Sequence, residues 1–339
     1  MRALSCIALL GLVLAVSAAE LKPHKATVYT VGRDAPFEVF IVSEDFDKLV
    51  YSQDDGGRQR GEFKQKQIAS IEYAGVTDGR WYTGRGKMNG GDLPAAIENF
   101  AKVSTGGATE YDRIQGFLSL LQAYAAAGKV TEAAAAADAM AEAFPRSAQL
   151  LDVLEKKAQV LLKAKKLDEA DAAYADLAKR DLGPMSDRAK AIAIGGKATV
   201  QGLKGDHAGA ATTADAGLKE LNRDKQEQAY ASLAIIGVRE KLASGDVAGA
   251  SALAGDILYL GDSAAVQAEA HLVVAESKAE TDKAAAFDHA VIAYLRAGDA
   301  PELQAKARSV ARKLGKALSD DESLPKADRL AYKTYTQKL

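Results

Sequence analysis

Histidine and cysteine are scarce in this sequence, which has four histidines and one cysteine among 339 residues. The cysteine, Cys6, lies in a short apolar run near the start of the chain. Without it the chain has no thiol, which excludes disulfides, thiol catalysis and cysteine-based metal sites. The histidines are far apart in sequence, and none has a metal-binding spacing such as H-E-x-x-H. They are His24, His207, His271 and His289. We expect isolated surface or packing roles for them, with no metal and no cofactor.

The sequence also has no large excess of positive or of negative charge. The chain has 44 Lys and Arg against 46 Asp and Glu, a formal net charge of −2. Nucleic-acid-binding proteins usually have a basic excess, so we expect no nucleic-acid partner. Hydrophobic residues make up 48% of the chain and charged residues 27%, which is typical of a globular protein.

Catalytic and nucleotide-binding motifs are absent as well. Residues 194–199, IGGKAT, resemble a phosphate-binding loop only superficially, because the first glycine and the hydroxyl directly after the lysine are missing and a helix is expected there. The segment Gly84 to Lys87 lacks the third glycine of a dinucleotide fingerprint. No G-x-S-x-G nucleophile elbow is found. Carboxylates are spread along the chain, which leaves a glycosidase pair open but unsupported. We expect a non-enzymatic protein.

The start of the chain, 1–19, has the pattern of a secretory signal peptide. Arg2 supplies a positive start, 7–16 is an apolar run, and Ser17 to Ala19 are small. Cleavage after Ala18 or Ala19 would give an exported protein, periplasmic or extracellular. The alternative is an uncleaved anchor, but the run is short for a bilayer span of about 20 residues. We expect no stable membrane insertion after cleavage.

Residues 20–76 differ from the rest in their β-branched and aromatic runs. Five short strands are expected, over 27–31, 37–42, 47–52, 58–64 and 68–73. Five strands in about 50 residues predict a small SH3-like or Sm-like β-barrel module. A module of this size is marginally stable alone, so we expect it to pack on the first helix pair.

The remainder, 77–339, is organised around a repeat. Residues 117–145 predict two antiparallel helices joined at Gly128-Lys129. Matching hinges precede alanines whose sequence numbers differ successively by 37, 37, 40 and 40, and a sixth hinge is Thr281-Asp282. The alanines are Ala96, Ala133, Ala170, Ala210 and Ala250. The pattern predicts a solenoid of about six to seven helical hairpins with two capping helices in 301–339. An irregular alanine-rich bundle is the alternative.

The best-formed repeat resembles the tetratricopeptide-repeat (TPR) family. Its matching residues are Phe117, Leu120, Leu121 and Tyr124, then Ala133, Ala137 and Pro145. The resemblance implies a mostly α, TPR-like solenoid whose first helices line a concave, protein-binding face. By this alignment the partner-binding residues are Gln115, Leu118, Gln122, Glu155 and Gln159. The Lys and Asn clamp that peptide-binding members use for a terminal carboxylate is absent at the aligned positions. The β-module is similar to one found ahead of TPR-type repeats in exported bacterial proteins.

The glycine-rich segment 75–91 is the expected joint between module and solenoid, with Trp81 and Gly84 as its hinge residues. The leading hypothesis is a non-enzymatic interaction scaffold or adaptor of the bacterial cell envelope, with a protein or peptide partner. Two alternatives remain. One is a structural envelope component that self-assembles, and the other is an accessory subunit of an envelope enzyme with a site near Trp81. The sequence does not specify the partner or the oligomeric state.

Overall fold

The computed structural model describes residues 21–33, 35–224, 226–258, 260, 264–298 and 300–339. By its internal contacts the chain divides into two compact units. The first is residues 1–160 with 182–184, and the second is residues 161–181 with 185–339. The first unit therefore holds the strands together with the first helices, and the expected module boundary at residue 76 lies inside it. The expected signal peptide lies outside the described residues.

All five predicted strands are present, within two or three residues of their expected bounds. They are β1 (His24–Thr30), β2 (Phe37–Glu44), β3 (Lys48–Ser52), β4 (Arg60–Lys64) and β5 (Ile68–Tyr73), with a 3₁₀ turn, Gln65–Gln67, before β5. They pair antiparallel in the order β4-β3-β2-β1-β5, so β4 and β5 are the edges in hydrogen bonding. The core of the sheet is built on Val28 and Leu49, which are fully buried.

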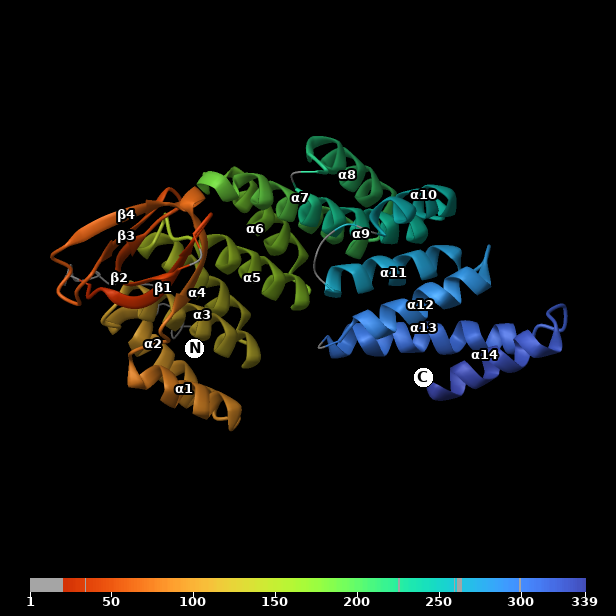
Figure 1. The fold of residues 1–339 in the computed structure, drawn as a ribbon, viewed down its shortest axis with the longest axis horizontal. Coiled ribbons are helices and arrows are strands. Elements are labelled where there is room, and N and C mark those ends of the chain that lie inside the picture. The colour runs from red at the N-terminus through yellow and green to blue at the C-terminus, as the bar shows by residue number, and fades with distance from the viewer. Residues whose placement is uncertain (1–20, 34, 225, 259, 261–263, 299) are drawn as a thin grey trace, which may run out of the picture. The chain divides into compact units, whose positions relative to one another are not determined.

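The described residues also form fourteen α-helices, so the chain is mostly α (Figure 1). In the first unit these are α1 (Gly79–Asn89), α2 (Leu93–Gly106), α3 (Glu110–Ala126), α4 (Val130–Ala143) and most of α5 (Leu150–Lys163). The others are α6 (Leu167–Lys179), α7 (Ser186–Leu203), α8 (His207–Glu220), α9 (Glu227–Ser244), α10 (Val247–Ile257), α11 (Ala264–Lys278), α12 (Lys283–Arg296), α13 (Pro301–Asp320) and α14 (Lys326–Lys338). The last two are the expected capping helices. No described helix is both long and apolar enough to span a membrane.

The predicted hinges are confirmed as helix boundaries. The first five each consist of a residue with positive φ followed by the N-cap residue of the second helix of a hairpin. In the sixth, Asp282 is the N-cap residue of α12. Glycine occupies the positive-φ position in four hinges, and Lys165, at φ 59°, occupies it in the fifth. A residue with positive φ is a common end of a helix. The five repeat alanines, together with Ala286 after the sixth hinge, are fully buried.

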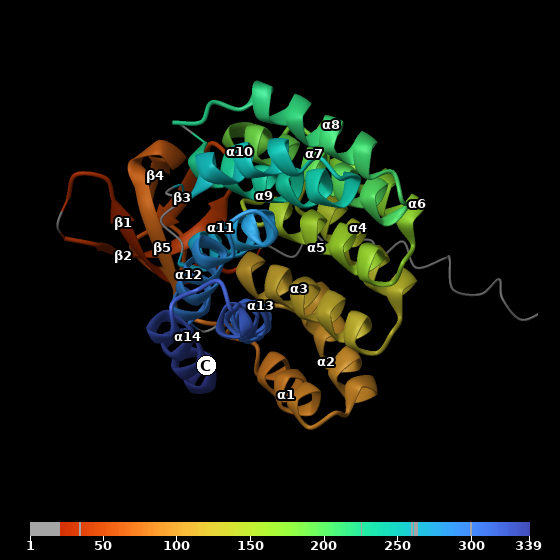
Figure 2. The same ribbon diagram turned by 90° about the vertical axis from the view of Figure 1, so that its right-hand side faces the viewer.

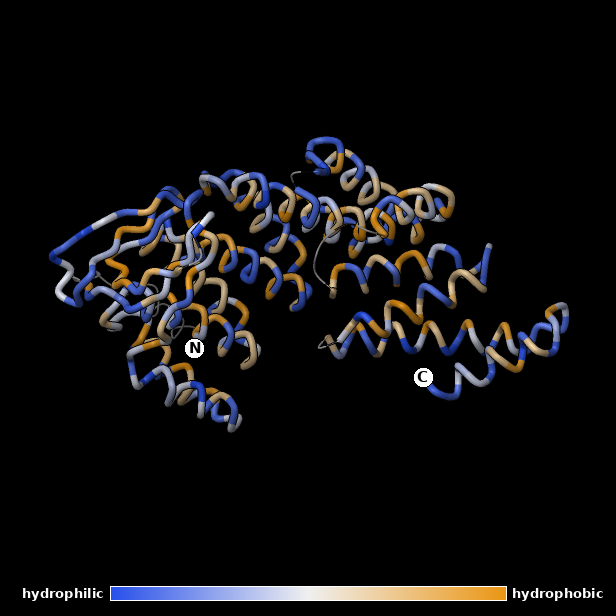
Figure 3. The backbone as a smooth tube through the Cα atoms, viewed as in Figure 1, coloured by the Kyte–Doolittle hydropathy of each residue, from blue (hydrophilic) through white to orange (hydrophobic). Residues whose placement is uncertain are grey.

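Buried alanines let neighbouring helices approach closely, and the helices stack accordingly. In the second unit α7 contacts α9, α9 contacts α11 and α11 contacts α13, while each also contacts its own hairpin partner. In the first unit α1, α2 and α3 lie side by side in this order (Figure 2). Hydrophobic and hydrophilic residues alternate along the helices (Figure 3), because each buries one face. This is the stacking of a TPR-like helical-hairpin repeat, not of an irregular bundle.

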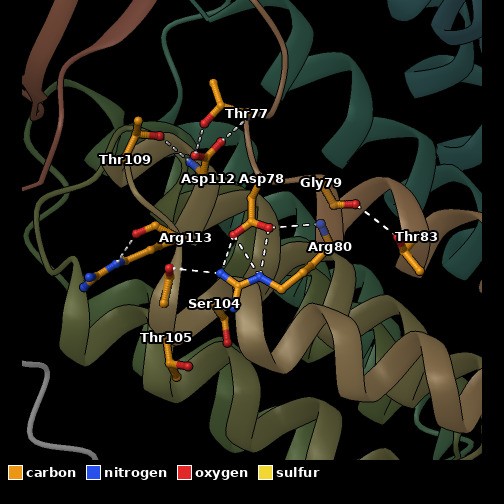
Figure 4. A network of polar contacts seen from close by, with 12 residues as sticks. Thr77, Asp78, Gly79, Arg80, Thr83, Ser104, Thr105, Thr109, Asp112 and Arg113 are labelled. Carbon is orange, nitrogen blue, oxygen red and sulfur yellow. Dashed lines mark hydrogen bonds and ion pairs between the residues drawn. The ribbon is translucent and has the colours of Figure 1, made fainter.

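Polar contacts tie the N-terminal sheet region, including the segment that follows β5, to α3 and to the α4–α5 connection. Asp112, fully buried on α3, accepts hydrogen bonds from the backbone N–H of Thr77 (2.8 Å) and from its hydroxyl (2.6 Å) (Figure 4). On the α4–α5 connection, Arg146 pairs with Asp47 at 2.6 Å. Among the described residues these ties lead to the second and third hairpins. The sheet is thus tied to the second and third hairpins as well, which the sequence did not predict.

Candidate functional site

A groove of about 460 Å³ lies in the first unit, on the side formed by α1, α3 and the start of α5. These are the first helices of three successive hairpins. Its lining residues are Trp81, Arg85, Met88, Asn89, Phe100, Gln115, Leu118, Ser119, Gln122, Gln149, Asp152 and Lys156. This volume is within the range of about 300–1,000 Å³ that is typical of ligand sites.

The lining positions follow a regular spacing. Trp81, Gln115 and Gln149 are evenly spaced in the sequence, and Met88, Gln122 and Lys156 have the same spacing. This interval is the length of one TPR unit, about 34 residues. Each first helix therefore presents equivalent positions to the groove, which makes this the inner face of a repeat.

The groove brings together three of the five residues that the sequence predicts for partner binding, namely Gln115, Leu118 and Gln122. Glu155 and Gln159 are not among its lining residues. They bond to each other, with the Gln159 amide donating to Glu155 at 3.0 Å.

The difference has a simple cause. Alignment on the hinges, whose sequence numbers differ by 37, places Glu155 and Gln159 opposite Leu118 and Gln122. Between the groove positions and the hinge, however, α5 has three more residues than α3. The groove positions themselves recur at the shorter TPR interval. Three helical residues rotate a side chain by about 300°, which leaves the aligned positions about 60° off the groove. The TPR interval, counted from Trp81 and from Met88, would have found Gln149 and Lys156.

Trp81 and Gly84 both lie on α1, in the glycine-rich segment that was expected to join the module to the solenoid. The Trp81 indole N–H donates to the Ser119 hydroxyl at 2.9 Å, which fixes the ring against α3. Gly84 is buried because α2 lies close, and a Cβ there would lie 2.7 Å from the Phe100 ring. Both residues therefore position the wall of the groove.

The groove combines three kinds of chemistry. Four carboxamides line it, those of Asn89, Gln115, Gln122 and Gln149. Each carboxamide can both donate and accept hydrogen bonds. The apolar part is formed by Trp81, Phe100, Leu118 and Met88. Arg85 and Lys156 bring positive charge, and Asp152 is the single carboxylate among the described lining residues.

A second, smaller cavity lies beside the groove, between the sheet and α3. It measures about 20 Å³, which is room for one water molecule, and Gln149 lines both spaces. The Tyr73 hydroxyl donates to the Glu44 carboxylate there, and its ring stacks on Tyr111 with centroids 4.2 Å apart. Burial raises the pKa of Glu44, although its hydrogen bonds from Tyr73 and Gln65 act in the opposite direction. Burial, with the nearby Glu44 and Asp45 carboxylates, raises the pKa of Glu110 to about 7.

The Glu110 carboxyl should make the stability of the first unit depend on pH. Its pKa in the folded chain, about 7, is above its ordinary 4.5, so the folded chain holds this proton more tightly than the unfolded chain. The contribution is fully present below about pH 4.5 and is lost as the pH rises to about 7. We expect a loss of roughly 1–2 kcal/mol, after reduction for the solvent contact of this partly exposed group.

Urea unfolding at about pH 5 and pH 8 measures this. Glu110→Gln should remove most of the difference by raising stability at the higher pH. An unchanged pH dependence in this variant would assign the effect to other groups.

The histidines give a mixed outcome. His24 is buried in β1 and contacts Thr109 at 3.3 Å, which is the expected packing role. His271 and His289 are not isolated, because α11 and α12 bring their Nδ1 atoms to 3.0 Å. Across the described residues no three His, Cys, Asp or Glu side chains are grouped so that they could hold a metal ion. Residues 194–199 lie inside α7, as expected.

The chain was compared with known proteins at the level of family, sequence and structure. No family model matches it, and no curated protein does. Among solved structures it is similar to the C-terminal part of a TPR repeat-containing protein from Cytophaga hutchinsonii, with 14% identity over 76% of this chain and 95% of that one, at a TM-score of 0.46. It is also similar to the apo form of RapI, with 11% identity over 76% of this chain and 75% of that one, again at 0.46. A tetratricopeptide repeat protein from Parabacteroides merdae has 13% identity over 68% of this chain and 97% of that one, at 0.32.

Proposed function

We propose that this protein is a non-enzymatic interaction scaffold that binds an extended segment of a partner protein in the groove of α1, α3 and α5. The observation that carries the proposal is the two series of equivalent positions, one TPR interval apart, which place three of the four carboxamides of the groove beside its apolar side chains. An extended peptide offers alternating N–H and C=O groups with no internal partners. Carboxamides can pair with both, and the apolar side chains of the groove can contact those of the peptide.

The lining also bears on the competing enzymatic function. Trp81 does lie in the groove, as the enzyme-subunit alternative requires. The described lining offers one carboxylate, Asp152, and no histidine, whereas glycoside hydrolysis by the usual route needs two carboxyl groups about 5–10 Å apart. Recognition without catalysis is the simpler use of this set of side chains.

The proposal is tested by selecting peptides from a random display library on residues 20–339. A synthetic copy of the most enriched peptide then serves as the probe. The double variant Gln115→Ala with Gln122→Ala removes two carboxamides, each worth about 1 kcal/mol in net hydrogen bonding. We expect affinity for the probe to fall roughly 30-fold, measured by fluorescence anisotropy.

The matched control is Gln159→Ala, on the same inner series of helices but outside the groove lining. It should bind like the parent, and all variants should melt within about 2 °C of it, because surface substitutions change stability little. Failure to enrich any peptide, or equal binding by the double variant, would refute the groove as the site.

Export to the cell envelope is the second part of the proposal, and it is supported by the signal-peptide pattern of 1–19. The mature protein isolated from its native host should begin at Ala19 or Glu20. N-terminal sequencing decides this, since recovery of Met1 would contradict cleavage.

A further inference from the structure

We infer that the segment bound in the groove is acidic, with carboxylates beside an apolar side chain. The inference rests on the proposed function and adds the chemistry of the partner. The observation behind it is that the lining contains two cations, Arg85 on α1 and Lys156 on α5. These helices are the first helices of the hairpins before and after the hairpin of α3.

These two cations differ from their neighbours in pairing. Lys87, two residues after Arg85, pairs with Asp92 at 3.1 Å. Lys157, the residue after Lys156, pairs with Asp138 at 2.6 Å. In the described part of the chain neither Arg85 nor Lys156 has an ion pair with an acidic side chain. Lys87 and Lys157, which do not line the groove, are therefore neutralised by acidic partners within the fold, whereas Arg85 and Lys156 remain available to a ligand.

The position of Arg85 is defined by the aromatic wall. Its guanidinium lies 4.9 Å from the centroid of the Trp81 ring, and Trp81 is itself fixed by Ser119. Stacking of this kind holds the planar guanidinium while its N–H groups remain available to a carboxylate. The site is thus built for a negative group next to an apolar surface.

The rest of the lining determines how such a segment fits. Leu118 and Met88 provide the contact for an apolar side chain, and the carboxamides of α3 provide partners for the backbone. Asp152 lies four residues before Lys156 on the same face of α5 and repels a carboxylate there. The carboxylates of the segment therefore belong chiefly next to Arg85, and Lys156 contributes less. With these three groups, the described lining has a formal charge of +1.

The experiment uses peptides with acetylated and amidated ends, so that no terminal carboxylate contributes. Peptides enriched by display should carry an excess of Asp and Glu over Lys and Arg. Changing each Glu and Asp of the best peptide to Gln and Asn should weaken binding about tenfold at low salt. Binding of the acidic peptide should also weaken as salt rises from about 50 to 500 mM, because partly exposed charges are screened.

The decisive variant is Arg85→Glu with Lys156→Glu. It should lose the acidic peptide by at least about 30-fold and should select basic peptides when the library is panned again. The matched control, Lys87→Glu with Lys157→Glu, makes the same change in net charge on the same helices outside the lining, and it should keep the acidic peptide within about threefold.

The outcomes separate the inference from the proposed function. Enrichment of peptides without an acidic excess, with binding still lost in the Gln115 and Gln122 double variant, overturns the acidic partner and retains the groove. If no peptide is enriched at all, both the inference and the proposed function are wrong. A parent that is dimeric by light scattering, with the Arg85 and Lys156 variant monomeric, would assign the groove to a second copy of this chain and overturn the inference.

Discussion

Replacing Gly116 by alanine is expected to lower the free energy of unfolding of the first unit by about 3 kcal/mol or more. Gly116 is buried on α3, where α2 crosses it closely. A Cβ added there would lie 2.4 Å from the backbone N of Ser104 and 2.8 Å from its Cα. Backbone atoms of a helix cannot move aside as a flexible side chain can, so α2 and α3 must separate. Overpacking typically costs about 1–3 kcal/mol, and contact with backbone belongs at the upper end.

The control is the same substitution at Gly86, inside α1, where an added Cβ meets nothing within 4 Å. Alanine is the better helix former by up to about 1 kcal/mol, so Gly86→Ala should be neutral or stabilising. Urea unfolding of both variants measures the difference. Equal stability of Gly116→Ala and the parent would mean that α2 and α3 do not pack as closely as described.

Removing the Asp112 carboxylate should be the second costly change, at about 2–3 kcal/mol. Asp112 is fully buried and receives both hydrogen bonds from Thr77, in the connection between β5 and α1. Asp112→Ala leaves those donors without their acceptor and opens a small cavity, each of which is destabilising. Because this contact ties the strands to α3, hydrogen exchange should quicken first in residues 68–77.

Two further variants identify the cause. Asp112→Asn can still accept the Thr77 N–H and can donate to its hydroxyl, so it should cost about 1 kcal/mol or less. Asp138→Ala removes a partly exposed carboxylate paired with Lys157 and should cost no more than about 1 kcal/mol. If Asn were as harmful as Ala, the charge and not the hydrogen bonds would hold the connection.

Local signals in the sequence were sufficient for the elements and for their repetition. Glycine adopts positive φ without strain and commonly ends a helix, so the hinges at Gly91, Gly128, Gly205 and Gly245 could be found without tertiary information. The buried alanines after them mark a close helix contact, because alanine has the smallest side chain that a helix can use without the penalty of glycine. The strands of the N-terminal sheet were equally local, since their β-branched and aromatic runs need no partner to be recognised.

Register and docking were different. Which residues of α5 line the groove depends on the number of residues between the groove and the hinge. Because α5 has three more residues there than α3, the lining residues are Asp152 and Lys156 and not Glu155 and Gln159. The hinge spacing of 37 contains no information on which end of the helix carries the extra residues.

Sequence patterns were therefore enough to predict about six to seven hairpins, the five strands and the α3 side of the groove. The contacts of the sheet, the face of α5 that completes the groove, and the cations there that remain unpaired became visible in the folded chain. The physical reason is that hinges and helix faces arise from neighbours within about four residues along the chain. Docking and ion pairing instead join residues such as Thr77 and Asp112, or Lys157 and Asp138, which only folding brings together.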